Sequence, residues 1–257
     1  MIGLLSFERR NAIYDIIKKQ GRADIAELVN RFGVSAETVR KDLILLEGRG
    51  LVRRVHGGAL RVGGAVPVLS LDQRSVLHRD KKQELCRYAL SLIEEDDWLF
   101  LDAGSTTDEL LPLLSERFKR LHIVTYHATL VNRLSSCPDF EIFVCGGRLE
   151  QAEEYFYGPL TEEALRSFRV AKAFICPSAF SLKVGATSNH FTCKVLMKAA
   201  ADIADKVYLL ADSEKLEKRG NFLLFEAEKV DGIVTDSALC DEIFELYREN
   251  GIKVVRG

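Results

Sequence analysis

The sequence predicts an α/β protein with an N-terminal winged helix-turn-helix domain followed by a mostly parallel α/β sheet domain. We place the first domain at residues 1–62, a linker at 63–78 and the second domain at 79–257. Residues 1–62 show hydrophobic residues at helical spacing, followed by two short strand patterns. In residues 79–257, apolar strand patterns alternate with helical ones. The charge divides at the same place, because residues 1–62 hold 12 Lys and Arg against 7 Asp and Glu while the remaining chain holds 24 against 31. A small basic segment before a larger acidic one indicates a polyanionic partner for the basic segment.

The composition excludes several classes of protein. With 47% hydrophobic and 29% charged residues, the chain has the composition of a soluble globular protein. No apolar run approaches the roughly 20 residues that a membrane-spanning helix needs, and the start MIGLLSFERR lacks the pattern of a signal peptide. We therefore expect a cytoplasmic protein with no membrane partner. The cysteines form no C-x-x-C pair, so we expect no disulfide, no bound metal and no cofactor. We predict mostly reduced, buried thiols at Cys86, Cys137, Cys145, Cys176, Cys193 and Cys240.

The first domain begins with two predicted helices. Ser6 is a suitable N-cap for the first, which carries apolar residues at helical spacing from Ile13 to Ile17 and ends at Gly21. Asp24 caps the second, with Glu27 in the capping-box position, and Gly33 ends it. The very short connection that follows is typical of a helix-turn-helix.

A third helix and a basic hairpin complete the domain. Ser35 caps the helix, in which Val39, Leu43 and Leu46 form the core-facing stripe. The segment LVRRVHGGALRV at 51–62 predicts two short strands around a His-Gly-Gly turn, which is a wing. Basic residues on a helix are often only its solvated face, but three capped helices with a basic wing favour DNA binding.

In this arrangement the third helix enters the major groove, and the wing contacts phosphates or the minor groove. The predicted DNA-binding residues on the helix are Ser35, Glu37, Thr38, Arg40 and Lys41, and those on the wing are Arg53, Arg54 and His56.

These residues also resemble a known family. The pattern S-x-x-T-V-R-K-D-L at 35–43, followed by L-E-G-R-G-L-V-R-R-V-H-G-G-A at 46–59, is similar to the N-terminal signature of the DeoR family of bacterial transcription regulators. The resemblance implies binding to a double-stranded DNA operator, usually as a repressor of a sugar-utilisation or related catabolic operon.

The sequence of the second domain predicts strands that alternate with helices. Strand patterns occur in 98–102, 121–126, 140–145, 171–176, 206–212, 232–236 and 252–257. Helical patterns occur after the first two strands and in 161–168, 191–205 and 241–250. This alternation predicts a mostly parallel sheet covered on both faces, which binds ligands outside the carboxyl ends of its strands.

That rule selects the candidate effector-binding residues. After the first strand, small and hydroxyl-bearing residues precede a helix. Such a turn can bind a phosphate through its N–H and hydroxyl groups and the positive end of the helix. The same residues can also serve only to cap the helix. No G-K-[ST] sequence follows, so this is not a Walker loop. The predicted residues are Asp102, Gly104, Ser105, Thr106 and Thr107 here, Thr125, Tyr126, His127, Gly146, Gly147 and Arg148 after the next two strands, and the cations Lys194 and Lys215.

The segments DAGSTT, VTY, GGRLE, YGPLTEEAL and LLADSEK resemble blocks of the DeoR-family effector domain. The resemblance implies a fold similar to ribose-5-phosphate isomerase and a phosphorylated sugar or sugar derivative as effector. Two blocks differ from the family pattern. Tyr126 and His127 stand where Asn and Ser are usual, and Cys176–Ala179 replaces Gly-Ala-Asp-Gly. The missing acid removes a candidate general base.

We therefore expect a transcriptional regulator that is not an enzyme. It should act as a repressor controlled by a phosphorylated small molecule and form a homo-oligomer, because a single winged domain reads few base pairs. Two alternatives remain open from the sequence. One is an isomerase-like enzyme that acts on sugar phosphates, and the other is a DNA-binding regulator whose effector pocket has degenerated.

Overall fold

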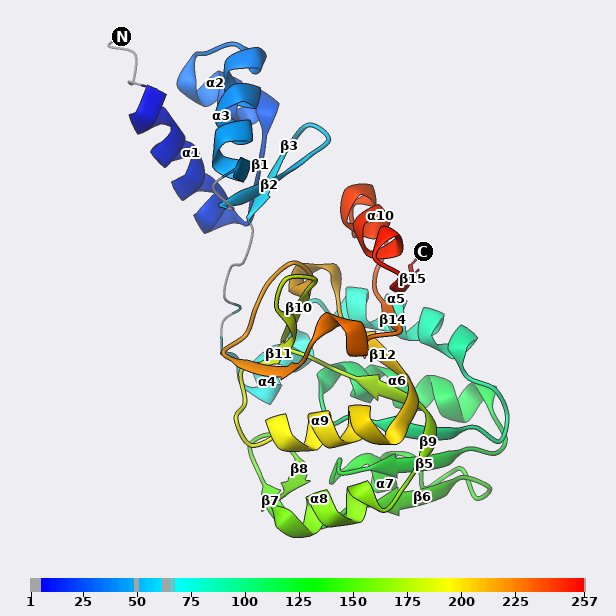
Figure 1. Cartoon of the computed structure of the whole chain (residues 1–257). Coiled ribbons are helices and arrows are strands. Elements are labelled where there is room, and N and C mark those ends of the chain that lie inside the picture. The colour runs from blue at the N-terminus through cyan, green and yellow to red at the C-terminus, as the bar shows by residue number, and fades with distance from the viewer. Residues whose placement is uncertain (1–5, 49–50, 62–65, 67, 257) are drawn as a thin grey trace. The chain divides into compact units, whose positions relative to one another are not determined.

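The structure is a computed structural model, and it describes residues 6–48, 51–61, 66 and 68–256 (Figure 1). The chain divides into two compact units, Met1–Gly64 and Ala65–Gly257. Each unit has its own core and is described by itself. In the part of the chain that the structure describes, no helix is long and apolar enough to cross a membrane.

The first unit is built from three helices and a small sheet. Its elements are α1 (Ser6–Gln20), β1 (Arg22–Asp24), α2 (Ile25–Phe32), α3 (Ala36–Gly48), β2 (Val52–Val55) and β3 (Gly58–Arg61). The predicted apolar stripes meet in its core, where Ile13, Ile17, Val39, Leu43 and Leu46 are at most 1% exposed. The three predicted helices and the two strands of the wing are confirmed.

The wing is part of a three-stranded sheet of order β1-β3-β2. The turn between β2 and β3 contains Gly57, whose φ of 83° suits glycine. Gly58 is needed for a different reason, since a Cβ there would lie 2.4 Å from the carbonyl oxygen of Ala23 in β1. The sequence did not predict β1, which adds a third strand to the hairpin.

The helix caps agree with the sequence at one helix and differ at another. Ser35 caps α3, because its Oγ accepts a hydrogen bond from the backbone N–H of Thr38 at 3.2 Å. The capping box predicted for Asp24 and Glu27 is wrong, since the Asp24 side chain makes no cap hydrogen bond to α2. Asp24 instead pairs with Arg22 at 2.8 Å, within the same short strand.

The second unit is organised around a seven-stranded sheet in which every neighbouring pair is parallel. Its order is β15-β14-β12-β9-β4-β5-β6. The strands are β4 (Trp98–Leu101), β5 (His122–Thr125), β6 (Glu141–Val144), β9 (Val170–Ile175), β12 (Ala204–Leu210), β14 (Gly232–Val234) and β15 (Lys253–Val255). All seven overlap predicted strand segments, although β12 begins two residues earlier, within the predicted helix 191–205, so the parallel α/β prediction is confirmed.

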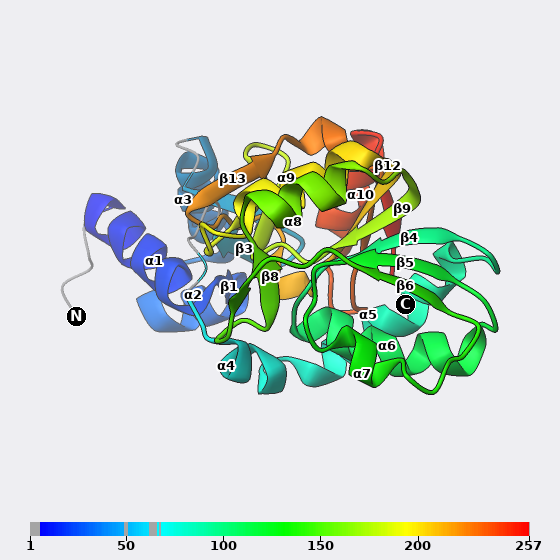
Figure 2. The same cartoon turned by 90° about the horizontal axis from the view of Figure 1, so that it is seen from below.

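Helices cover both faces of this sheet. Figure 2 shows α5, α6 and α7 on one face and α8 and α9 on the other. The helices are α4 (Leu71–Val76), α5 (Arg79–Ala89), α6 (Ser105–Arg117), α7 (Leu130–Arg133), α8 (Pro159–Arg166), α9 (Lys194–Ile203) and α10 (Asp241–Glu249), with 3-10 turns η1 (Leu90–Leu92), η2 (Ser213–Lys215) and η3 (Ala227–Lys229). The layer under α5, α6 and α7 forms the large apolar core.

Two small sheets lie outside the main one. One is the hairpin of β7 (Arg148–Glu150) and β8 (Tyr155–Tyr157), and the other contains β10 (Ala179–Ser181), β11 (Gly185–Ser188) and β13 (Phe222–Phe225). Neither was predicted, because their strands are short and the sequence shows no alternation there.

The predicted linker at 63–78 needs correction. The second unit begins at Ala65, and α4 lies inside the predicted linker. A complete capping box starts this helix, because Ser70 Oγ accepts from the Gln73 N–H at 3.3 Å and Gln73 Oε1 accepts from the Ser70 N–H at 3.1 Å. A helix of six residues is too short to show a hydrophobic period. Residues 62–65 and 67 lie outside the described part of the chain.

Candidate functional site

The predicted reading face of the first unit is on the surface. On α3 and at its cap, Ser35, Glu37, Arg40 and Lys41 are exposed and Thr38 is half-buried. An ion pair of 3.5 Å links Arg40 to Glu37, and both side chains are more than half exposed. An exposed pair of this kind is weak, so the guanidinium can exchange it for a phosphate or a base.

The wing is tied to the end of α3 by Arg54. Its guanidinium Nε contacts Glu47 at 2.7 Å, and its backbone N–H donates to the same carboxylate at 2.8 Å. Burial opposes ionisation of Glu47, but the hydrogen bonds from Arg54 prevail and lower the pKa of Glu47. His56 is exposed and Arg53 is half-buried. Arg54 therefore has a structural role in addition to its predicted contact with DNA.

The second unit contains a cavity of about 220 Å³. It lies where β4 and β9 are neighbours, although β5 and β6 follow β4 in the chain. From this point, β5 and β6 extend the sheet on the side of β4, and β12, β14 and β15 extend it on the side of β9. Such a switch point leaves a crevice at the carboxyl ends of the two strands, and ligands bind there in open α/β sheets.

Asp102 follows β4 at the base of this cavity and is fully buried. One carboxylate oxygen accepts from the Tyr126 hydroxyl and from the Ala103 N–H at 2.9 Å, and the other accepts from the Cys176 N–H at 2.8 Å. Burial outweighs these hydrogen bonds and raises the pKa of Asp102 to about 6. The carboxyl group joins the ends of β4 and β9 at the switch point.

Helix α6 begins at the cavity. Gly104 precedes it with a φ of 151°, a conformation that L side chains rarely adopt, and no side chain caps the helix. Ser105 and Thr106 of its first turn line the cavity. The first N–H groups of a helix have no partner within the helix, so this end of α6 can donate hydrogen bonds to an anion.

Lys82 of α5 is the most unusual cation of the cavity. It is 2% exposed, and its Nζ donates to the carbonyl oxygens of Arg74 at 2.5 Å and Ser75 at 3.0 Å. Among the described residues, no carboxylate lies within 4.0 Å of this ammonium group. Burial, and then the nearby Lys215, lowers the pKa of Lys82. A buried cation without a counterion is costly, and an anion in the cavity would stabilise it.

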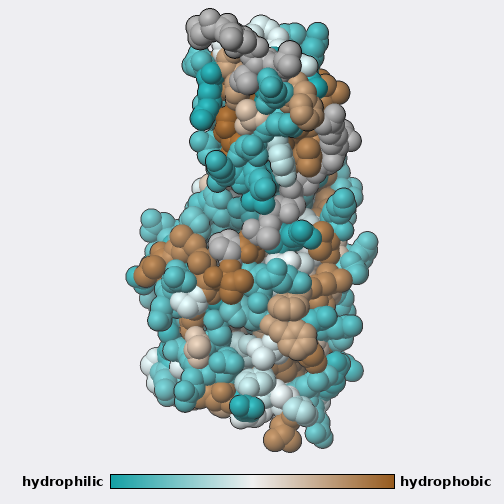
Figure 3. All heavy atoms as spheres, turned by 90° about the vertical axis from the view of Figure 1, so that its left-hand side faces the viewer, coloured by the Kyte–Doolittle hydropathy of each residue, from teal (hydrophilic) through white to brown (hydrophobic). Residues whose placement is uncertain are grey.

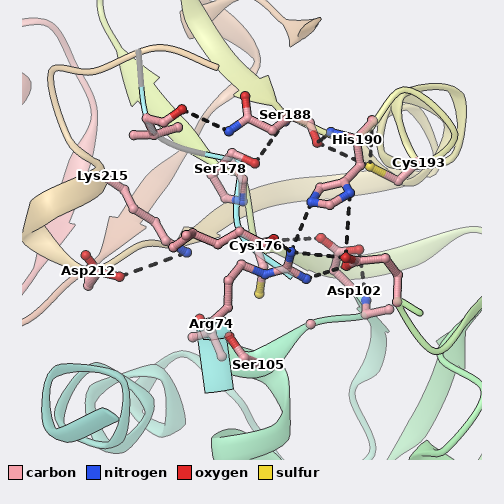
Figure 4. A pocket seen from close by; sticks show the side chains of 18 of the residues that line it. Arg74, Asp102, Ser105, Cys176, Ser178, Ser188, His190, Cys193, Asp212 and Lys215 are labelled. Atoms are coloured by element: carbon pink, nitrogen blue, oxygen red, sulfur yellow. Dashed lines mark hydrogen bonds and ion pairs between the residues drawn. The ribbon is translucent and has the colours of Figure 1, made fainter. Parts of the chain in front are cut away.

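Arg74 and His190 also line the cavity, and Figure 4 shows their side chains in contact with each other. The Arg74 guanidinium pairs with both carboxylate oxygens of Glu153, in one case at 3.3 Å. It also lies 3.0 Å from His190 Nε2. Burial lowers the pKa of His190, so the neutral ring can accept this hydrogen bond.

The structure brings together six of the thirteen predicted effector-binding residues. The residues that line the cavity are Asp102, Gly104, Ser105, Thr106, Tyr126 and Lys215. The other seven do not line it: Thr107, Thr125, His127, Gly146, Gly147, Arg148 and Lys194.

Several of these seven residues have structural partners instead. The buried Thr125 donates to the Leu101 carbonyl at 2.7 Å, and His127 contacts Asp108 at 3.0 Å. The residues from Gly146 to Arg148 follow β6, which is at the edge of the sheet and two strands from β4. Gly147 packs so closely against Thr161 that a Cβ would lie 2.2 Å from its Oγ1. Distance from the switch point therefore explains the absence of Gly146 to Arg148 from the cavity, whereas Thr125 and His127 are directed to other partners.

Sequence reasoning missed the residues that reach the cavity from outside the sheet. These are chiefly Arg74, His78, Lys82, Glu153, Ser178, Asn189, His190 and Lys218. For Lys82 the sequence did contain a signal, because Lys82 is in helical register with the buried Leu85, Cys86 and Ala89. A lysine on the apolar face of a helix is rare and indicates a function.

The cysteines were predicted to be reduced and mostly buried. All six are free thiols, of which Cys86, Cys145 and Cys193 are buried and the other three half-buried. Burial raises the pKa of the cavity thiols Cys176 and Cys193 to about 12, so both stay protonated at neutral pH. Within the described ranges, no group of three or more His, Cys, Asp and Glu side chains could hold a metal ion.

Comparison with known proteins identifies the family. Residues 9–63 match the DeoR-like helix-turn-helix domain, and residues 77–237 match the DeoR C terminal sensor domain. The regulator IolR of Bacillus subtilis is 27% identical over 93% of this chain and 95% of its own length. The repressor GlcR of the same species is 28% identical over 96% and 95%, and an uncharacterized HTH-type regulator of Haemophilus influenzae is 30% identical over 92% and 91%.

Among solved structures, ribose 5 phosphate isomerase A from Neisseria gonorrhoeae aligns with 52% of each chain at 14% identity and a TM-score of 0.38. A score this low leaves the expected likeness to that enzyme a prediction. The domain matches extend over both units, and the relatives align over nearly their full length. The chain belongs to the DeoR family and is a DNA-binding transcriptional regulator with a C-terminal sensor domain.

Proposed function

We propose that this regulator is a cytoplasmic repressor of a sugar or related catabolic operon, and that a phosphorylated small molecule bound in the cavity of the second unit controls its affinity for DNA. The observation that carries the proposal is Lys82, a buried ammonium group with no carboxylate within 4.0 Å among the described residues, which lines the same cavity as the first turn of α6. Both features favour an anion. The hydroxyl groups of Ser105, Ser178 and Ser188 provide hydrogen bonds suited to a polyhydroxylated ligand.

Thermal unfolding of the full chain tests the ligand class. The panel consists of phosphorylated sugars, the same sugars without phosphate, and inorganic phosphate. A ligand at 100 times its dissociation constant adds about 2.7 kcal/mol to the free energy of unfolding. Unfolding is followed by the fluorescence of Trp98, which is the only tryptophan and lies in β4 of the second unit. Stabilisation by unphosphorylated sugars as strong as that by the phosphorylated ones would contradict the proposal.

For DNA, we propose that the predicted residues of α3 and the wing contact the operator. Arg40→Ala and Lys41→Ala are each expected to weaken specific binding by about 1–3 kcal/mol if the side chain contacts a base. The measurement is a titration of DNA fragments from the operon neighbourhood of the gene at two salt concentrations. Lys19→Ala, a change of the same charge at an exposed site on α1, is the control. Equal affinities for the parent and all three variants would overturn the assignment of this reading face.

The raised pKa of Asp102 predicts a pH dependence of stability. The folded state binds a proton with a pKa of about 6, whereas the unfolded carboxyl has a pKa of about 3.9. Between these values the folded state binds more protons, so the contribution of Asp102 to stability falls as pH rises, by at most about 3 kcal/mol. Asp102→Asn removes this dependence. From pH 4 to pH 7, the parent should therefore lose stability relative to Asp102→Asn. The free energies of unfolding of both proteins are measured in urea through the fluorescence of Trp98. A constant difference would show that Asp102 ionises normally.

We also propose that the regulator is a homo-oligomer. Phe191 is 67% exposed and packs edge-on against Phe222, and Leu160 is 71% exposed. Figure 3 shows that apolar residues gather on parts of the visible surface. Exposed apolar patches mark interaction sites in soluble proteins. Sedimentation of the full chain at several concentrations measures the oligomeric state directly.

A further inference from the structure

The Arg74–Glu153 pair lies in the wall of the same cavity as Lys82 and the first turn of α6. Arg74 and Glu153 both line the cavity, and their side chains are 24% and 12% exposed. The guanidinium contacts both oxygens of the carboxylate, which is the geometry with which arginine also binds a phosphate. Glu153 therefore holds the arginine as an anionic ligand would.

We propose that Glu153 acts as an internal competitor of the effector, and that the anionic group of the effector displaces it from Arg74. This proposal rests on the proposed function of the cavity. We call the Arg74–Glu153 pair, together with His190, the latch. Its three residues come from α4, from the turn between β7 and β8, and from the segment between β11 and α9. Displacement of Glu153 thus frees the β7–β8 turn from α4.

The contacts around the latch favour this exchange. The other carboxylates of the cavity wall have different partners. Glu214 pairs with Lys81 and Lys218, and Asp212 lies 4.0 Å from Lys215. Asp102 accepts hydrogen bonds from the Tyr126 hydroxyl and from two backbone N–H groups. Arg74 differs from these lysines, because both of its terminal nitrogens contact the carboxylate of Glu153. An anion bound near Lys82 would lower the positive potential that holds Glu153 and would itself attract the guanidinium.

A second set of contacts, outside the Arg74–Glu153 pair, also connects the cavity to α4. Lys82 holds the carbonyls of Arg74 and Ser75 in the last turn of α4, and Arg74 Nη1 donates to the Leu69 carbonyl at 2.8 Å. Helix α4 is the first helix after the segment that leaves the winged domain. An anion that engages both cations acts on both ends of this helix, so α4 is the element through which cavity occupancy reaches the preceding chain.

Calorimetric titration of the full chain with inorganic phosphate at constant ionic strength tests the latch. Glu153→Gln removes the competing charge while keeping the shape of the side chain. We expect it to bind phosphate at least about ten-fold more tightly than the parent, because phosphate then no longer competes with a carboxylate for the Arg74 guanidinium. Glu154→Gln is the matched control, since the adjacent carboxylate contacts Thr129 and does not line the cavity. It should bind like the parent.

Hydrogen exchange of the segment 150–156 provides a second readout. Phosphate should accelerate exchange there in the parent, and the segment should already exchange rapidly in Glu153→Gln without phosphate. Equal or weaker phosphate binding by Glu153→Gln overturns the latch. If the parent then still binds phosphate and Lys82→Met does not, the proposed function stands without it. If neither the parent nor Glu153→Gln binds phosphate, the anion site and the latch both fail.

Discussion

Lys82→Met is expected to remove most of the response of the second unit to its anionic ligand. The ammonium group is buried in the cavity wall and has no carboxylate partner among the described residues, so a bound anion would be its counterion. Removing one partner of a buried, hydrogen-bonded charge pair costs about 2–5 kcal/mol of binding free energy. A ligand that adds about 2.7 kcal/mol to the stability of the parent should therefore add less than about 1 kcal/mol to that of the variant at the same concentration.

The unliganded Lys82→Met protein should remain folded. Methionine keeps most of the apolar stem of lysine, and the loss of a buried charge partly offsets the loss of donors to the Arg74 and Ser75 carbonyls. Lys198→Met is the matched control, because this lysine is exposed on α9 and outside the cavity lining. A full thermal shift in Lys82→Met, with normal unfolding of the unliganded protein, would exclude Lys82 from ligand binding.

Asp42→Ala is expected to strongly destabilise the first unit while leaving the second intact. Asp42 is 3% exposed, and its carboxylate contacts Arg9 at 2.6 Å and Arg10 at 3.4 Å. Removing one partner of a buried ion pair costs about 3–5 kcal/mol, and the partial exposure of both arginines favours the lower figure. A unit of this size has a total stability of only about 3–9 kcal/mol. Helix α3 would lose its link to α1, and specific DNA binding with it.

Two spectroscopic signals separate the units in this experiment. Far-UV circular dichroism of Asp42→Ala should show lost helix or an early transition, whereas the Trp98 transition and the ligand response should match the parent. Asp15→Ala removes the same charge from an exposed site on α1 and should leave both signals unchanged. Simultaneous loss of the Trp98 transition would mean that the two units do not fold independently.

Local patterns in the sequence determined most of the secondary structure. The stripes of α1 and α3 and the apolar runs of all seven parallel strands are visible because each element buries a face or a whole segment within its own unit. The Ser35 cap was also predictable, since the acceptor and its donor are three residues apart. The pairing of the Asp24 side chain was not predictable, because Asp24 belongs to a strand that the sequence did not reveal and contacts Arg22 of that strand.

The composition of the cavity was decided by tertiary structure. From the order of the strands in the chain, the turns after β4, β5 and β6 are equally good candidates for the ligand site. In the sheet, however, β9 lies beside β4, and β6 lies at the edge. The ends of β4 and β9 therefore meet through Asp102 and Cys176, while Gly146 to Arg148 lie outside the cavity. Arg74, Glu153 and His190 are up to 116 residues apart in the chain. The sequence determined which strands and helices form, because their signals are local; only the packing of distant segments decided which side chains share the cavity, because strand order and long-range ion pairs leave no local pattern.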